Sequence, residues 1–83
     1  MMKGRRVYPD NEGHLWLKPG DYGKDPRNNH WMARPPKGHT GDLNNHEVIE
    51  HDDGTITVTP SILIIAGRDT WHGYLEKGNW REC

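Results

Sequence analysis

Alternating apolar and polar residues on either side of Asp53-Gly54 constrain this chain more than any other feature. Val48–Glu50 and Thr55–Thr59 alternate with a period of two, the period of a half-buried β-strand. An Asp-Gly pair between such runs is typical of a tight hairpin, because the turn needs positive φ angles. The sequence therefore predicts an antiparallel hairpin here, as the start of a β-meander of four or five short strands over residues 46–83.

The register of this hairpin is predicted from its two faces. A two-residue loop places His51 opposite Ile56 and Ile49 opposite Val58, which makes one face largely apolar. A three-residue loop sets Ile49 against Thr57 and mixes the two faces. The pattern favours the two-residue loop.

The next strand of the meander is predicted at Ile62–Ala66. This apolar, β-branched run shows no alternation, which is typical of a strand covered on both faces. We expect Trp16, Leu17 and Trp31 to cover its second face, over Leu63 and Ile65.

A final hairpin is predicted around Lys77-Gly78, with two registers open. A two-residue loop sets Leu75 opposite Trp80, and a three-residue loop sets Tyr74 opposite Trp80. Lysine is a poor first residue for a type I′ turn, so the three-residue loop is favoured.

Length and composition predict one small all-β domain over residues 1–83. A chain of this size buries only about 60–65% of its unfolded surface, so its stability margin is thin. No stretch offers ten residues of helical periodicity with caps, and at most one helical turn is expected, near Asp42–Asn45. Residues 1–43 are predicted to form a loop-rich cap, with short strands at Val7-Tyr8 and His14–Leu17 and a loop at Asp21–Asn29.

Cysteine usage and apolar runs indicate the compartment. The single cysteine excludes an internal disulfide framework and fits a reducing, intracellular environment. The basic N-terminus is not followed by the apolar run of a secretory signal, and the longest apolar run, Ile62–Ala66, is too short to span a membrane. We expect a cytoplasmic protein.

Histidines are frequent enough to suggest a metal site. Zinc prefers three or four nitrogen, sulfur or oxygen ligands arranged tetrahedrally. The best set joins His72 to Cys83 or Glu82 across the final hairpin and adds a loop histidine, His39 or His46. His46, His72 and Cys83 are therefore the candidate zinc ligands, although isolated histidines more often make surface hydrogen bonds. The six histidines are His14, His30, His39, His46, His51 and His72.

Charge is distributed unevenly and suggests a second alternative. Residues 1–37 carry eight Lys/Arg and four Asp/Glu, whereas residues 38–83 carry three and eight. Trp16 and Trp31 offer rings on which the bases of a single strand would stack. A pI near 6.6 makes nucleic acid the weaker interpretation. The candidate phosphate contacts are Arg5, Arg6, Arg34 and Lys37.

The densest aromatic patch lies in the final hairpin and is the candidate binding surface: Trp71, His72, Tyr74 and Trp80. Aromatic side chains of this kind are enriched at protein interfaces, and core packing is the competing interpretation for them. No nucleophile elbow and no glycine-rich phosphate loop is present, so a non-enzymatic role is favoured and no cofactor is expected apart from zinc in the alternative.

Two segments resemble a known family: DGTITVTPSI, from Asp53 to Ile62, and WHGYLEKGNW, from Trp71 to Trp80. They are similar to small bacteriophage and prophage proteins of unknown function, some of which carry the label "ammonia monooxygenase". The resemblance covers the C-terminal half of the chain. Broader relatives carry a cysteine shortly before the position of His72, where this sequence has Asp69, Thr70 and Trp71 instead.

Together these features predict a phage-encoded accessory protein that binds a host or phage protein and inhibits or sequesters it. Zinc binding and single-strand nucleic-acid binding are the alternatives. The small core and the open edge that a meander leaves also predict a homodimer.

Overall fold

The computed structural model describes residues 2–83, and this part of the chain contains β-strands and no helix. The predicted all-β class is confirmed. The strands are β1 (Met2–Lys3), β2 (Arg5–Arg6), β3 (Asp21–Asp25), β4 (His30–Ala33), β5 (Gly41–Asp42), β6 (Glu47–Glu50), β7 (Ile56–Thr59), β8 (Ile62–Ala66), β9 (Asp69–Glu76) and β10 (Asn79–Glu82).

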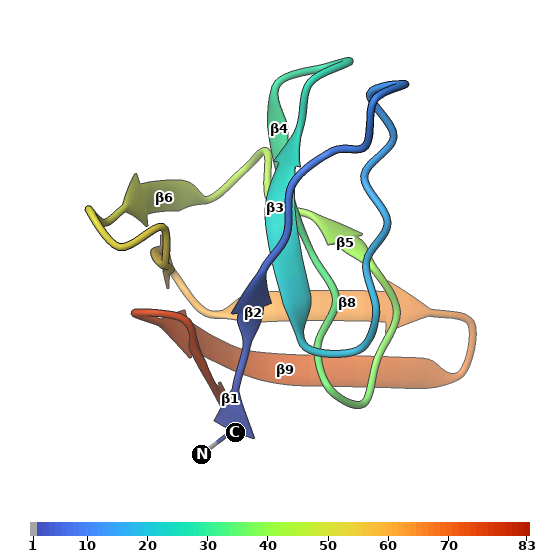
Figure 1. Cartoon of the computed structure of the whole chain (residues 1–83). Helices are drawn as coiled ribbons and strands as arrows, with labels where there is room; N and C mark the ends of the chain where they lie inside the picture. The colour runs from blue at the N-terminus through green and yellow to red at the C-terminus, as the bar shows by residue number, and fades with distance from the viewer. Residues whose placement is uncertain (1) are drawn as a thin grey trace.

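The strands form three sheets (Figure 1). The C-terminal sheet has the order β1-β10-β9-β8 and is antiparallel. The N-terminal sheet has the order β2-β3-β4-β5, with β2 parallel to β3, and β6 and β7 form a separate hairpin. The predicted meander is therefore realised only over β8, β9 and β10. The break before β8 falls at Pro60, which has no N–H to continue a ladder.

The N-terminal residues contain more sheet than the sequence predicts. Val7-Tyr8 and His14–Leu17 are not strands, whereas β3 occupies most of the predicted loop. Strand β3 begins at Asp21 and ends at Asp25, and both aspartates are buried. An arginine neutralises each of them: Arg5 lies 3.0 Å from Asp21, and Arg27 lies 3.1 Å from Asp25. Polar composition predicted a loop here because such partners are not visible in a linear pattern.

One apolar core joins the three sheets. In Figure 1, β3 and β4 run across β8 and β9, so the two larger sheets pack face to face with crossed strands. Each sheet contributes to the same cluster, and Leu43 closes it just after β5. The buried apolar residues are Tyr22, Ala33, Leu43, Ile56, Val58, Ile62, Trp71, Leu75 and Trp80.

Trp80 connects the two larger sheets. Its indole Nε1 donates to the carbonyl oxygen of Gly20 at 3.0 Å, and the amide of Arg5 donates to the same oxygen at 3.0 Å. Its ring meets Trp71 edge to face, with centroids 5.3 Å apart. A Cβ at Gly4 would lie 2.7 Å from the indole nitrogen, so a glycine lets the chain pass from β1 to β2 at this point.

The predicted register of the first hairpin is wrong. Val48 pairs with Val58 and Ile49 with Thr57, which is the register of the three-residue loop. Gly54 takes a φ of 87°, and the Asp53 carboxylate accepts hydrogen bonds from the amide and the hydroxyl of Thr55. The turn thus fixes the register and leaves Ile49 47% exposed.

The favoured register of the last hairpin is also wrong. Leu75 pairs with Trp80, which is the register of the two-residue loop. Lys77 and Gly78 have φ angles of 48° and 78°, as a type I′ turn requires. The amide of Lys77 donates to the Thr57 hydroxyl at 3.0 Å, and the amide of Gly78 donates to the carbonyl of Ile56, also at 3.0 Å. These bonds to β7 hold lysine in a conformation that it rarely adopts.

Gly73 is a position in β9 where a side chain has no room. A Cβ there would lie 2.5 Å from Cη2 of Trp71 and would also meet the carbonyl oxygen of Arg81. We expect Gly73→Ala to lower the free energy of unfolding by about 3 kcal/mol, because backbone and indole must both move. Gly67→Ala is the control, since Gly67 has a φ of 62° and open space around it, and should cost about 1 kcal/mol. Equal losses in urea denaturation would contradict this packing.

Acid should destabilise the fold through turn carboxylates. A hydrogen bond from the Trp16 indole lowers the pKa of Asp10, and one from Thr55 lowers the pKa of Asp53, from an ordinary value of 3.8. A lowered pKa contributes stability above the ordinary value and loses it as the pH falls through the folded value. We expect the urea midpoint to fall progressively from about pH 4 downward. Asp53→Asn should reduce this dependence, and an unchanged profile in that variant would contradict the role of Asp53.

Candidate interaction surface

Strand β8 is an edge strand, and only one of its faces is covered. Ile62 is 1% exposed and Ile64 half-buried, whereas Leu63 is 55% and Ile65 67% exposed. The expectation of a strand covered on both faces is therefore wrong. Trp16, expected to cover the second face, is itself 71% exposed. We call the exposed face of β8, β9 and β10 the outer face.

The backbone of β8 also has unpaired groups at its free edge. The carbonyl oxygen of His72 accepts a hydrogen bond at 3.0 Å from the amide of the last residue, so the backbone groups of His72 point toward β10. Backbone direction alternates along an antiparallel strand, so the neighbours of His72 bond β8 at Ile62 and Ile64. Leu63 and Ile65 therefore direct their N–H and C=O groups away from the sheet.

The outer face continues from β8 onto β9 and β10. Leu63 lies opposite His72, and Ile65 lies opposite Thr70. Tyr74 is the next outward residue of β9, and the guanidinium of Arg81 stacks over its ring at 4.3 Å from the centroid. An exposed apolar pair is thus bordered by an imidazole and an aromatic ring.

The other sheet edges are protected by the devices that β-proteins use against unwanted pairing. Strands β1 and β5 have two residues each, and β2 consists of two arginines. Strand β6 carries Glu47 and Glu50. The edge of β7 is occupied, because the amide of Gly78 donates to the carbonyl of Ile56 at 3.0 Å. Strand β8, with five uncharged residues, has none of these protections.

The structure divides the predicted aromatic patch between two environments. Trp71 and Trp80 are 3% and 2% exposed and belong to the core, so they do not contribute to an exposed surface. His72 is exposed and Tyr74 is half-buried, and both lie on the outer face. Leu63 and Ile65 were missed as surface residues, because an unbroken apolar run carries no signal for the face that stays uncovered.

The candidate zinc ligands lie around Ser61. Nε2 of His46 is 3.1 Å from the Ser61 carbonyl oxygen, and Nε2 of His72 is 2.9 Å from the Ser61 hydroxyl. Cys83 is exposed and joins the group only through its backbone amide, bonded to the carbonyl of His72. Over residues 2–83, no three or more His, Cys, Asp or Glu residues are arranged to hold a metal ion.

The candidate phosphate-binding residues differ in their availability. Arg5 pairs with Asp21, and this hydrogen bond raises the pKa of Arg5 above its ordinary value. Arg6 is mostly buried and pairs with a carboxylate of β6. Arg34 donates one hydrogen bond to a backbone carbonyl and makes no ion pair within residues 2–83, and the same part of the chain gives Lys37 no carboxylate partner. Only Arg34 and Lys37 keep their charge available.

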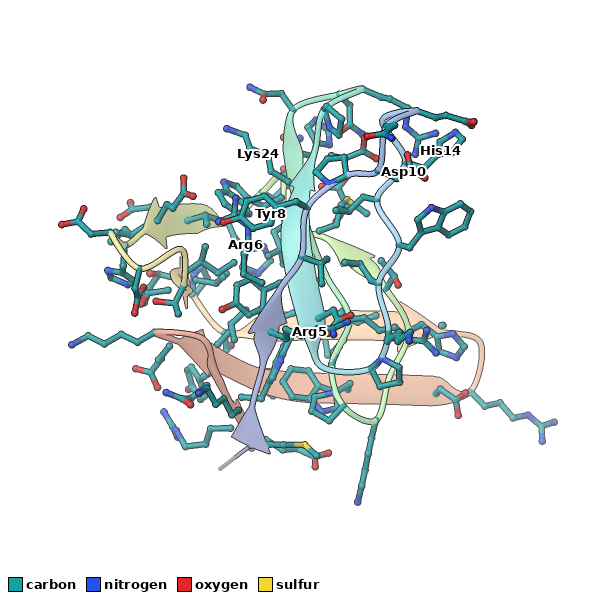
Figure 2. All side chains as sticks on the ribbon, viewed as in Figure 1. Arg5, Arg6, Tyr8, Asp10, His14 and Lys24 are labelled. Atoms are coloured by element: carbon teal, nitrogen blue, oxygen red, sulfur yellow. The ribbon has the colours of Figure 1, made fainter. Side chains whose placement is uncertain are left out.

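Arg6 instead fixes the β6–β7 hairpin against the N-terminal sheet. Its guanidinium lies 4.5 Å from the ring centroid of Tyr8 and 4.8 Å from that of Trp31. It donates to Glu50 at 2.7 Å and to the carbonyl of Gly54 at 2.9 Å. Figure 2 shows Arg6 and Tyr8 together on the side of β3 that faces β6. This contact is structural, because the surrounding rings cover the charge.

Comparisons with known proteins identify no relative. No protein-family model matches this chain, and neither does a curated protein or a solved structure. Residues 2–83 form no helix with the length and apolar character that crossing a membrane requires.

Proposed function

We propose that this protein is a small, non-enzymatic protein-binding module whose binding site is the free edge and outer face of β8. The observation that supports the proposal is the exposure of Leu63 and Ile65 on an uncharged edge strand. Long, apolar edge strands without protection are sites of pairing with another chain. Every other sheet edge of residues 2–83 is short, charged or already bonded.

The proposed mode of binding is the addition of a partner strand to the C-terminal sheet. The outward N–H and C=O groups of Leu63 and Ile65 supply backbone hydrogen bonds, which give affinity without regard to sequence. Their side chains, with His72 and Tyr74, then select for apolar or aromatic residues on the same face of the partner strand. In this mode of binding, specificity comes from the side chains and not from the backbone hydrogen bonds between β8 and the partner strand.

The proposed biological role is that of a phage-encoded accessory protein that sequesters or blocks a host or phage protein. The resemblance of Asp53–Ile62 and Trp71–Trp80 to small phage proteins supports this role. A second copy of the chain also satisfies an open edge, so homodimerisation stays a prediction. Sedimentation at tens of micromolar tests it, and a monomer at that concentration would count against the dimer.

Threonine substitutions on β8 test the binding site. We expect Leu63→Thr/Ile65→Thr to reduce partner capture from a bacterial lysate about tenfold, because two apolar anchors are lost while strand propensity is kept. Ile49→Thr is the matched control, since Ile49 is a similarly exposed isoleucine on another strand. Capture is quantified by mass spectrometry. Equal capture by both variants would exclude the outer face.

A proline substitution separates strand pairing from simple apolar contact. Ile65→Pro removes one outward N–H and leaves the ladder to β9 intact, as an edge strand allows. We expect it to reduce capture as strongly as the threonine pair. Retained capture with an unchanged melting temperature would show that the partner does not extend the sheet.

Chelation distinguishes this proposal from the zinc alternative. We expect EDTA to leave the melting temperature unchanged, because Nε2 of His46 and Nε2 of His72 are each within hydrogen-bond distance of Ser61. Elemental analysis gives the metal content of the purified protein. About one equivalent of zinc, with a lower melting temperature after chelation, would favour the zinc module.

A further inference from the structure

A second surface feature lies beside the turn from β8 to β9. A hollow of about 530 Å³ opens between the segment after β4 and this turn. Its cationic side chains are Arg34, Lys37 and Arg68. We call it the basic hollow. Its lining is polar and contains no tryptophan, tyrosine or aliphatic side chain beyond the stems of these residues and Thr70.

The three cations of the basic hollow form no ion pair with a carboxylate of residues 2–83. Within residues 2–83, four of the eleven Lys and Arg residues form ion pairs with carboxylates: Arg5, Arg6, Arg27 and Arg81. Three of the remaining seven line this one hollow, although the chain as a whole carries a net charge of −1. Among the described residues that line the hollow, Asp69 alone carries a carboxylate, and Nε2 of His39 lies 3.2 Å from it.

The hollow is also partly preorganised. Nη1 of Arg34 donates to the carbonyl of Leu17 at 3.1 Å, which fixes the guanidinium plane and leaves its remaining N–H groups for a ligand. Pro35 is buried beneath the next residues, so the backbone that presents Lys37 is held in place. A guanidinium that is already positioned loses less entropy when it binds an anion.

We propose that the basic hollow binds a phosphate-type polyanion, either a free polyphosphate or the phosphodiester backbone of a nucleic acid. Three cations around one site carry more positive charge than a ligand with a single carboxylate would neutralise. A ligand with successive phosphate groups matches them in charge. The volume exceeds that of one phosphate, and the polar lining offers no surface on which a base or an apolar side chain would stack.

This site goes beyond the proposed protein-binding function and does not depend on it. Leu63 and Ile65 do not line the hollow, and none of the three cations lies on strand β8. Each proposal therefore fails or stands on its own set of variants.

Titration of the intact protein with tripolyphosphate, followed by amide NMR, tests the proposal. We expect shifts confined to the backbone around Gly38 and Thr70, which border the hollow. Arg68→Gln and Lys37→Gln should each weaken binding about tenfold, since each removes a charge-assisted contact. Lys77→Gln is the control of equal charge change, because Lys77 lies at the other end of β9, roughly 23 Å away.

A short single-stranded oligonucleotide distinguishes the two sources of phosphate. An oligonucleotide that competes with tripolyphosphate and is lost with the same variants supports a nucleic-acid backbone, and one that does not compete leaves the free polyphosphate as the ligand. Three outcomes would overturn the proposal: no localised shifts, equal weakening by Lys77→Gln, or tighter binding of an acidic peptide than of tripolyphosphate.

Discussion

The carbonyl oxygen of Gly20 is the point on which the arrangement of the two larger sheets depends. It accepts hydrogen bonds from the Trp80 indole and from the Arg5 amide, so one buried acceptor serves a strand of each sheet. Packing of the sheets buries the indole N–H of Trp80, and this carbonyl supplies the acceptor that a buried donor requires. Trp80 thereby orients Trp71 and with it the buried face of β9.

The exposed surface follows from this packing. The N-terminal sheet and the β6–β7 hairpin both pack on one face of the C-terminal sheet, and no segment of residues 2–83 remains for the other. A chain with 31% hydrophobic residues has few side chains to spare, yet Leu63 and Ile65 stay in solvent. This exposure is the observation on which the proposed binding site rests.

The cationic side chains of this chain divide into those that make structural ion pairs and those that do not. Arginines near the N-terminus neutralise buried aspartates or lie beneath aromatic rings, where they hold loops and hairpins in place. The cations around the basic hollow form no ion pair within residues 2–83, although Arg34 donates a hydrogen bond to the carbonyl of Leu17. Apolar exposure thus lies along the outer face of β8, and free positive charge lies beside its turn to β9.

The sequence by itself determined the all-β class, the sites of the turns and the strands β7 to β10, because period-two alternation and Asp-Gly or Lys-Gly pairs are local signals. Register, sheet membership and exposure were decided by tertiary structure. Asp53 and Gly54 selected a turn that exposes Ile49, bonds from β7 held Lys77 at positive φ, and buried ion pairs turned a polar segment into β3. In the candidate site, the aromatic cluster of the last hairpin indicated His72 and Tyr74 together with two tryptophans that are buried. Leu63 and Ile65 were not predicted, because which face of an apolar strand stays uncovered depends on where the rest of the chain packs.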